Sequence, residues 1–192
     1  MALLDMLQQR LGSETVREIS SRIGADPGTT GNAIDAALPL LISALARNAG
    51  DSNRVQALAR ASDDHDGSIL DDVPGFVSSA SEKPGAGILG HVLGGRQQAV
   101  QNGLSQVTGL DAAKAGTLLT MLAPLVMGAL GRTKRENGLD AGGLATVLTA
   151  EQEHLKQSAP GVMGALGRFL DSDGDGSVLD DVSGMLSKAF KR

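Results

Sequence analysis

Residues 111–132 read DAAKAGTLLTMLAPLVMGALGR, and this stretch decides the fold class. Asp111 is a typical helix N-cap, because its carboxylate accepts hydrogen bonds from the first backbone N–H groups of a helix. No charge stands between Lys114 and Arg132, and Pro124 interrupts the apolar run. The stretch predicts a long apolar helix with a proline break. We expect it in a protein core, because its 17 uncharged residues fall just short of a membrane span.

The first half of the chain carries a related stretch 85 residues earlier. Asp26 and Pro39 have the same spacing as Asp111 and Pro124. Each pair predicts a capped apolar helix that contains a proline. A third fragment, APGVMGALGR at 159–168, differs at one position from the APLVMGALGR of the first stretch. The chain is therefore internally repeated.

Two aspartate-rich segments are also related to each other. SDDHDGSILDDV occupies residues 62–73 and DSDGDGSVLDDV occupies residues 171–182. We predict two quasi-repeated halves, 1–80 and 85–192, because a polar segment rich in Gly, Ser and Pro separates them. The expected fold is an all-α array of roughly six to ten helices with a C-terminal EF-hand-like helix-loop-helix.

The segment 171–182 has the pattern of a calcium-binding loop. Calcium needs several oxygen ligands, and alternate acidic side chains in one short loop supply them. Gly176 stands where an EF-hand loop turns, but position twelve is Val182 and not the usual Glu. One of two later acids would have to close the shell. The predicted ligands are Asp171, Asp173, Asp175, Ser177, Asp180 and Asp181.

The alternative is a solvent-exposed acidic turn in which Asp180 caps the last helix. Five carboxylates in eleven residues repel one another unless they are solvated or share a cation. Oxygen ligands favour calcium over zinc or copper, and magnesium demands a tighter octahedral geometry. The upstream segment has one fewer acid at the corresponding ligand positions, because it begins with Ser62, so we interpret it as a structural turn with a weaker case for metal; its candidate positions are Ser62, Asp64, Asp66, Asp71 and Asp72. His65 is expected to be an exposed histidine there.

Small residues recur at helical spacing in both apolar segments of the second half. Such residues let helices approach closely, within one domain or between identical subunits. Head-to-tail contacts between quasi-repeated chains predict a homo-oligomer or a filament. The residues are Gly87, Gly90, Gly94, Gly128, Ala129 and Gly131.

Composition excludes several function classes. The chain has a net charge of -5 and no Trp or Tyr, which disfavours nucleic-acid binding. It has no cysteine, so disulfides and thiolate chemistry are absent. The opening MALLDMLQQRLG lacks the pattern of a secretory signal, and we expect a cytoplasmic protein that does not insert in a membrane.

No catalytic motif is visible. His91 lies in GHVLGGR, which lacks the GK[ST] ending of a phosphate loop, and no strand is predicted before it. His154 lies in a charged run with Glu151 and Glu153 that we interpret as a solvated helix face. No serine has a G-x-S-x-G context. We therefore predict that the protein is not an enzyme.

Three segments together resemble the YidB-like family, a bacterial domain of unknown function. They are GAGILGHVLGGRQQAVQNGLSQVTGLD at 85–111, LLTMLAPLVMGALGR at 118–132 and DSDGDGSVLDDVSGML at 171–186. The resemblance is clearest from Gly85 onward. It implies an all-α helix array, and it implies neither an activity nor catalytic residues.

Three function classes remain from the sequence, of which an enzyme of unfamiliar type has the least support. The first is a non-enzymatic structural or self-assembling helical protein with a calcium-binding loop. The second is a module that binds an unknown protein partner, in which calcium only stabilises the fold. Sedimentation with calcium or chelator separates these two.

Overall fold

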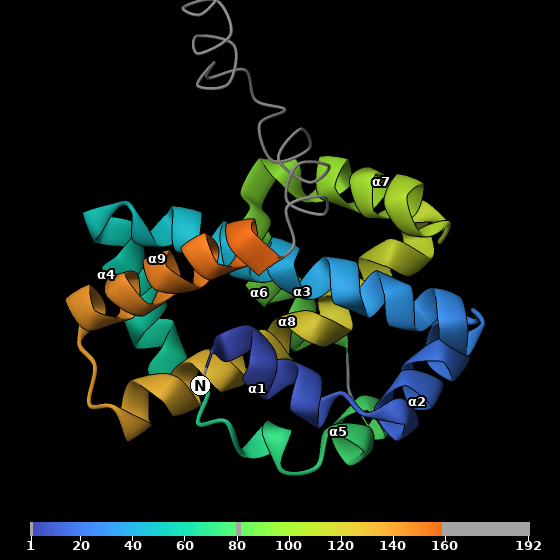
Figure 1. The fold of residues 1–192 in the computed structure, drawn as a ribbon, viewed down its shortest axis with the longest axis horizontal. Helices are drawn as coiled ribbons and strands as arrows, with labels where there is room; N and C mark the ends of the chain where they lie inside the picture. Colours follow the sequence, from blue (N-terminus) through green and yellow to red (C-terminus); the bar gives the residue numbers. More distant parts are fainter. Residues whose placement is uncertain (1, 80–81, 159–192) are drawn as a thin grey trace, which may run out of the picture.

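The computed structural model describes residues 2–79 and 82–158, and these form helices without a strand among them (Figure 1). The predicted all-α class is confirmed. The first helices and one 3-10 turn are α1 (Leu3–Arg10), α2 (Ser13–Ile23), α3 (Pro27–Ala49), α4 (Ser52–Asp63), η1 (Ser68–Leu70) and α5 (Val73–Ser79). The remaining elements are α6 (Glu82–Leu93), η2 (Gly94–Arg96), α7 (Gln97–Thr108), α8 (Ala112–Glu136) and α9 (Ala141–Ser158).

The two longest helices, α3 and α8, begin at the aspartates that the sequence predicts as caps. Asp26 Oδ1 accepts a hydrogen bond from the Thr29 backbone N–H at 2.8 Å. Asp111 Oδ1 accepts one from the Lys114 N–H at 2.9 Å. Both predicted caps are confirmed, and they fix where the long helices start.

The helix before each cap ends in the same way. Gly24 terminates α2 with φ of 64°, and its N–H bonds to the Ser20 carbonyl. Gly109 terminates α7 with φ of 79°, and its N–H bonds to the Ser105 carbonyl. Glycine suits both positions because an L side chain is strained in the left-handed region.

The prolines do not break the long helices, contrary to the sequence-based prediction. Pro39 lies inside α3 and Pro124 lies inside α8, and both helices continue past them. Pro124 has no N–H to donate to the Thr120 carbonyl four residues earlier. Gly85 of α6 lies against that same oxygen, so close that a Cβ on Gly85 would come within 2.0 Å of it. The close approach of α6 thus occurs where the proline leaves a carbonyl without its helical partner.

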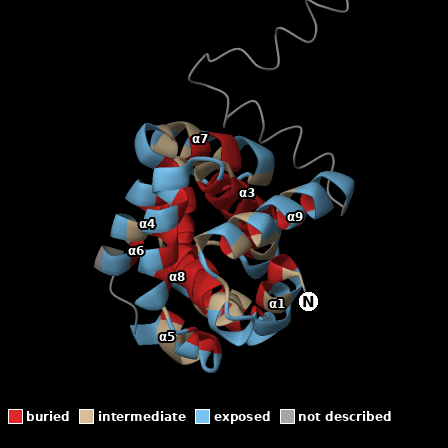
Figure 2. Ribbon diagram, turned by 90° about the vertical axis from the view of Figure 1, so that its left-hand side faces the viewer, coloured by how far each residue is buried: buried red, intermediate tan, exposed pale blue. Residues whose placement is uncertain are grey.

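The core is built around α3 and α8. Figure 2 shows the buried residues concentrated on these two helices, with exposed residues on the outer faces of α4 and α6. One hydrophobic cluster draws residues from both predicted halves, including Leu38, Leu41 and Leu45 of α3 and Leu118, Leu122 and Leu125 of α8. α9 packs on α3 and α4 across the boundary of the predicted halves.

Both long helices are long and apolar enough to cross a membrane by length and composition. In each, 78% of the most apolar 18-residue stretch is buried inside the protein. Burial against other helices is a sufficient reason for their hydropathy, because core helices of this length are also apolar. The cytoplasmic location stays a prediction.

Glu151 of α9 corrects the interpretation of its segment as a solvated face. This side chain is only 5% exposed. Its two carboxylate oxygens accept hydrogen bonds from the backbone N–H groups of Leu3 and Leu4, each at 2.9 Å. The carboxylate therefore satisfies the first turn of α1 and ties it to α9. Glu153, two residues on, pairs with Lys156 at the surface as the charged pattern suggests.

Candidate functional site

The predicted calcium loop lies outside the described residues. This applies to all six proposed ligands, Asp171, Asp173, Asp175, Ser177, Asp180 and Asp181. Its upstream relative, residues 62–72, is described, and it links α4 to α5 through η1. Its contacts show what a loop of this sequence does in the fold.

Two of the upstream carboxylates bind groups inside or next to the loop. Asp66 Oδ1 accepts hydrogen bonds from the Ser68 N–H at 2.9 Å and the Ser68 hydroxyl at 2.6 Å. Asp72 Oδ1 accepts one from the Gly75 N–H at 2.9 Å in the first turn of α5. These acids stabilise the turn itself and the helix that follows it.

The Ser68 bonds also change the acidity of Asp66. The hydroxyl and the backbone N–H of Ser68 lower the pKa of the Asp66 carboxyl below its ordinary value, because they stabilise the charged form. The positive charges of Arg135 and Arg132 act in the same direction with smaller effect.

Two further acids pair with cations on α8. Asp71 Oδ1 lies 2.7 Å from Arg132 Nη2. Asp63, at the end of α4, pairs with Lys134, whose ammonium also donates to the Ala59 carbonyl at 2.7 Å. Both cations are mostly buried and both acids are largely exposed. The loop is therefore attached to α8 by paired charges.

Glycines let the loop lie directly on α8. A Cβ on Gly131 would come within 1.8 Å of the His65 carbonyl oxygen, and a Cβ on Gly128 would lie 3.0 Å from Ile69 Cγ1. Within the loop, Gly67 has φ of 79°, and a Cβ there would lie 2.7 Å from Arg132 Cβ. The small residues of α8 thus accept a loop, where the sequence suggested a second helix.

These contacts match the interpretation of residues 62–72 as a structural turn. The carboxylates that make polar contacts there bind Ser68, the α5 N-terminus, Arg132 or Lys134. Within residues 2–79 and 82–158, no group of three His, Asp or Glu side chains is placed to hold a metal ion.

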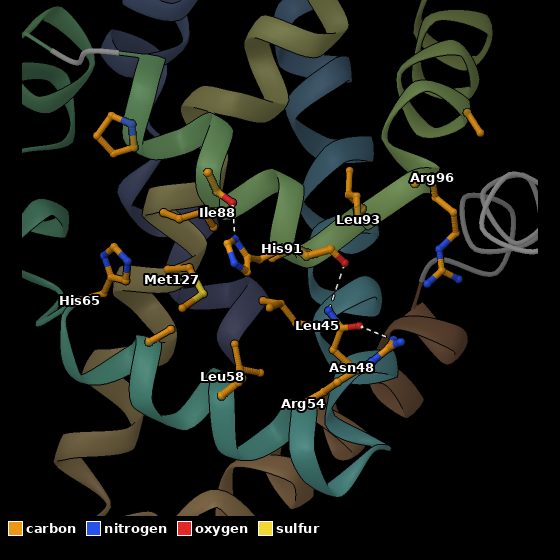
Figure 3. Close-up of a pocket in the computed structure, with 18 residues that line it drawn as sticks. Leu45, Asn48, Arg54, Leu58, His65, Ile88, His91, Leu93, Arg96 and Met127 are labelled. Atoms are coloured by element: carbon orange, nitrogen blue, oxygen red, sulfur yellow. Dashed lines mark hydrogen bonds between the residues drawn. The ribbon is translucent and has the colours of Figure 1, made fainter.

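A groove lies between α4 and α6 (Figure 3). Its volume is about 960 Å³. Large aliphatic side chains from α3, α4, α6 and α8 form its floor, and most of their surface is buried. They include Leu45, Leu58, Ile88, Val92, Leu93 and Met127.

Small residues form the walls of this groove. Ala57 and Ala61 come from α4, and Gly87 comes from α6. A Cβ on Gly87, and one on Gly90 a turn later, would meet nothing within 4 Å. The same holds for Gly94, which starts η2. These three glycines therefore make no close helix contact among the described residues, and a contact between identical subunits stays a prediction.

The ionisable residues of the lining are Arg54, Arg96, His65 and His91, and none of the described lining residues is acidic. Arg54 and Arg96 lie at one end of the groove and His65 at the other (Figure 3). His65 is half-buried rather than fully exposed as predicted. His91 Nδ1 lies 2.8 Å from the Gly87 carbonyl oxygen of its own helix.

Sequence reasoning did not find the groove, because no motif marks it. Its lining comes from helices that are far apart in the chain and meet only in the fold. One signal was present: Gly87 and Gly90 weaken helix α6 by about 1 kcal/mol each relative to alanine. No close contact among the described residues requires either glycine.

The geometry defines an all-helical protein with an apolar groove and a loop docked on its central helix. Residues 5–133 match the family described as bacterial protein of unknown function, DUF937. The chain belongs to that family, and the YidB-like resemblance is consistent with it. The match runs from α1 to the last turn of α8, so it includes the first half, where the motif resemblance is weaker. No curated protein and no solved structure matches the chain.

Proposed function

We propose that this protein is a non-enzymatic helical interaction module that binds an apolar helical segment of a protein in the α4–α6 groove. The observation that supports it is the groove itself, with an aliphatic floor and small residues on its walls. Grooves of this kind bind one face of an amphipathic helix through side chains three and four residues apart. Small wall residues leave room for large side chains of the bound helix.

The composition of the groove supports binding over catalysis. Its described lining contains no Asp, Glu, Ser, Thr, Lys or Cys that could act with a histidine as acid, base or nucleophile. His91 interacts through Nδ1 with its own helix. The lining offers apolar contact and positive charge, which position a ligand without transforming it.

Self-assembly is the case in which the bound helix belongs to a second copy. A groove on one copy and a helix on the next make a heterologous contact, which generates a ring or a filament. The net charge of -5 gives no general attraction to nucleic acid, and we expect a protein partner.

We also propose a calcium site at residues 171–181, in an EF-hand-like helix-loop-helix. The spacing of Asp171, Asp173 and Asp175 supports it. The related upstream loop uses α8 cations and local donors to offset its carboxylates. The downstream loop has Asp171 at its first ligand position, where the upstream loop has Ser62, so it offers calcium one more carboxylate ligand.

The proposed fold has two quasi-repeated halves. The matched glycine ends of α2 and α7 and the matched aspartate caps of α3 and α8 support it. Lys114, at the start of α8, also donates to the Gly24 carbonyl at the end of α2 at 2.6 Å. The two equivalent junctions therefore lie beside each other.

Sedimentation velocity tests assembly through the groove. Ala57 and Gln56 are adjacent exposed residues of α4, but only Ala57 lines the groove. We expect Ala57→Glu to abolish concentration-dependent association and Gln56→Glu to leave it unchanged. Equal association in both variants contradicts the groove as the assembly surface. A wild-type chain that stays monomeric contradicts self-assembly and leaves another protein as the partner.

Calorimetric titration with calcium tests the metal proposal. The wild-type chain should release or absorb heat on binding, and the double variant Asp173→Ala/Asp175→Ala should not. The matched control is Asp64→Ala/Asp66→Ala in the upstream loop, which should bind calcium as the wild type does. Equal heats from the wild type and the Asp173/Asp175 variant would rule out the downstream loop.

A further inference from the structure

We propose that the α4–α6 groove is covered in the free protein by residues 159–170 of the same chain, APGVMGALGRFL. This proposal depends on the α4–α6 groove being the binding site of the proposed function, and it names the segment that fills the groove in the free protein. A partner helix, or a second copy, then has to displace this segment. The groove would therefore be a regulated binding site.

The position of α9 supports an occupant from the same chain. α9 packs against α3 and α4, and Ser158 is the last residue that the structure describes. Figures 1 and 3 both place its last turn beside the start of α4 and the junction of α6 with α7, near the end of the groove where Arg54 and Arg96 lie. The next residues include Pro160 and Gly161, which are typical of a turn. A short connection gives a tethered segment a high effective concentration.

The apolar residues of the segment suit the groove. In a helix, Met163, Leu166 and Leu170 would share one face, with Phe169 beside them. The nine residues that follow Gly161 would form a helix about 14 Å long. The groove walls offer small residues, and Gly87 has open space where a Cβ would stand. Large side chains on the segment and small residues on the walls are complementary.

A nearly identical sequence already packs on the same two helices. Residues 123–132 of α8 differ from 159–168 at one position. In the fold, α8 packs on both α4 and α6, and its Met127 contributes to the groove floor. Met163 is the counterpart of Met127. The segment thus has a composition that these helices accept.

A fluorescence experiment on the full chain tests the proposal. The protein contains no Trp, so Phe169→Trp supplies a single indole. Its quenching by acrylamide is measured alone, with Ala57→Glu in the groove, and with Gln56→Glu beside it. We expect the indole to be protected several-fold alone and with Gln56→Glu, and to become accessible with Ala57→Glu.

Each other outcome overturns the inference. An indole that is accessible in all three proteins shows that the segment does not cover the groove, and leaves the groove open for a partner. An indole protected in all three shows docking elsewhere. Protection that appears only as the protein concentration rises shows a second copy as the source. Leu170→Trp repeats the measurement if Phe169→Trp does not fold, and circular dichroism checks folding.

Discussion

Two glycines of α8 lie in crowded surroundings, whereas two glycines of α6 border open space. Gly128 and Gly131 of α8 lie against the loop 62–72, where a Cβ on Gly131 would overlap the His65 carbonyl. Gly87 and Gly90 of α6 have open space where a Cβ would stand. The first pair is required by the fold, whereas the second weakens its helix with no contact in return among the described residues.

The difference separates residues that build the fold from residues available for binding. On α8, the loop 62–72 and the helix meet through glycines and paired charges. Between α4 and α6 lies a groove that the described helices leave unfilled. We therefore expect substitutions in the two regions to act on different properties, stability in the first and docking in the second.

The largest effect is expected for Gly131→Ala. Its new methyl group would clash with backbone oxygens of residues 62 and 65, and we expect a loss of about 3 kcal/mol in the free energy of unfolding. Gly90→Ala is the matched control and should gain about 0.5 to 1 kcal/mol from helix propensity. Denaturant unfolding followed by circular dichroism measures both. Equal effects would remove the distinction between the two glycine sets.

Glu151→Ala tests a buried charge that stabilises the fold. The substitution leaves the Leu3 and Leu4 N–H groups without their carboxylate, and we expect a loss of about 2 kcal/mol. Glu153→Ala, which removes only a surface pair, should cost less than about 0.5 kcal/mol. Hydrogen exchange of the α1 amides should rise with Glu151→Ala alone. Unchanged α1 exchange would show that this contact does not hold the helix.

Gly87→Ala should separate the effect on stability from the effect on docking in the α4–α6 groove. The methyl group meets no atom of the described residues, so the free energy of unfolding should rise by up to about 1 kcal/mol. The same methyl group enters the groove and should increase quenching of the Phe169→Trp indole. Unchanged quenching of the indole would show that the segment does not lie against Gly87.

The smallest effect concerns Asp66. Its pKa lies below the ordinary value chiefly because of Ser68, so Ser68→Ala should raise it. A depressed folded pKa stabilises the protein above the unfolded pKa of 3.8, and this contribution is lost as pH falls through the folded pKa. Carboxyl NMR titration measures the shift, with Asp26 as an internal control. An unmoved Asp66 titration would show that the Ser68 hydroxyl bond does not form in solution.

The helical class and the two aspartate caps were predictable because apolar spacing and capping chemistry are local properties of the sequence. The prolines were misjudged because a helix can continue past proline when burial holds both sides together, as α8 does at Pro124. The role of Glu151 and the groove depended on which helices meet. Contacts across more than a hundred residues, such as Leu3 with Glu151, leave no local pattern.

Cross-linking within the chain tests the central claim, that the α4–α6 groove holds the apolar segment 159–170. The protein has no cysteine, so Ala57→Cys with Leu166→Cys supplies the only thiol pair, and Gln56→Cys with Leu166→Cys is the control. We predict that the disulfide within one chain forms at least about ten-fold faster in the Ala57 pair, because docking raises the local concentration of the thiols. Equal rates in the two pairs would contradict the account.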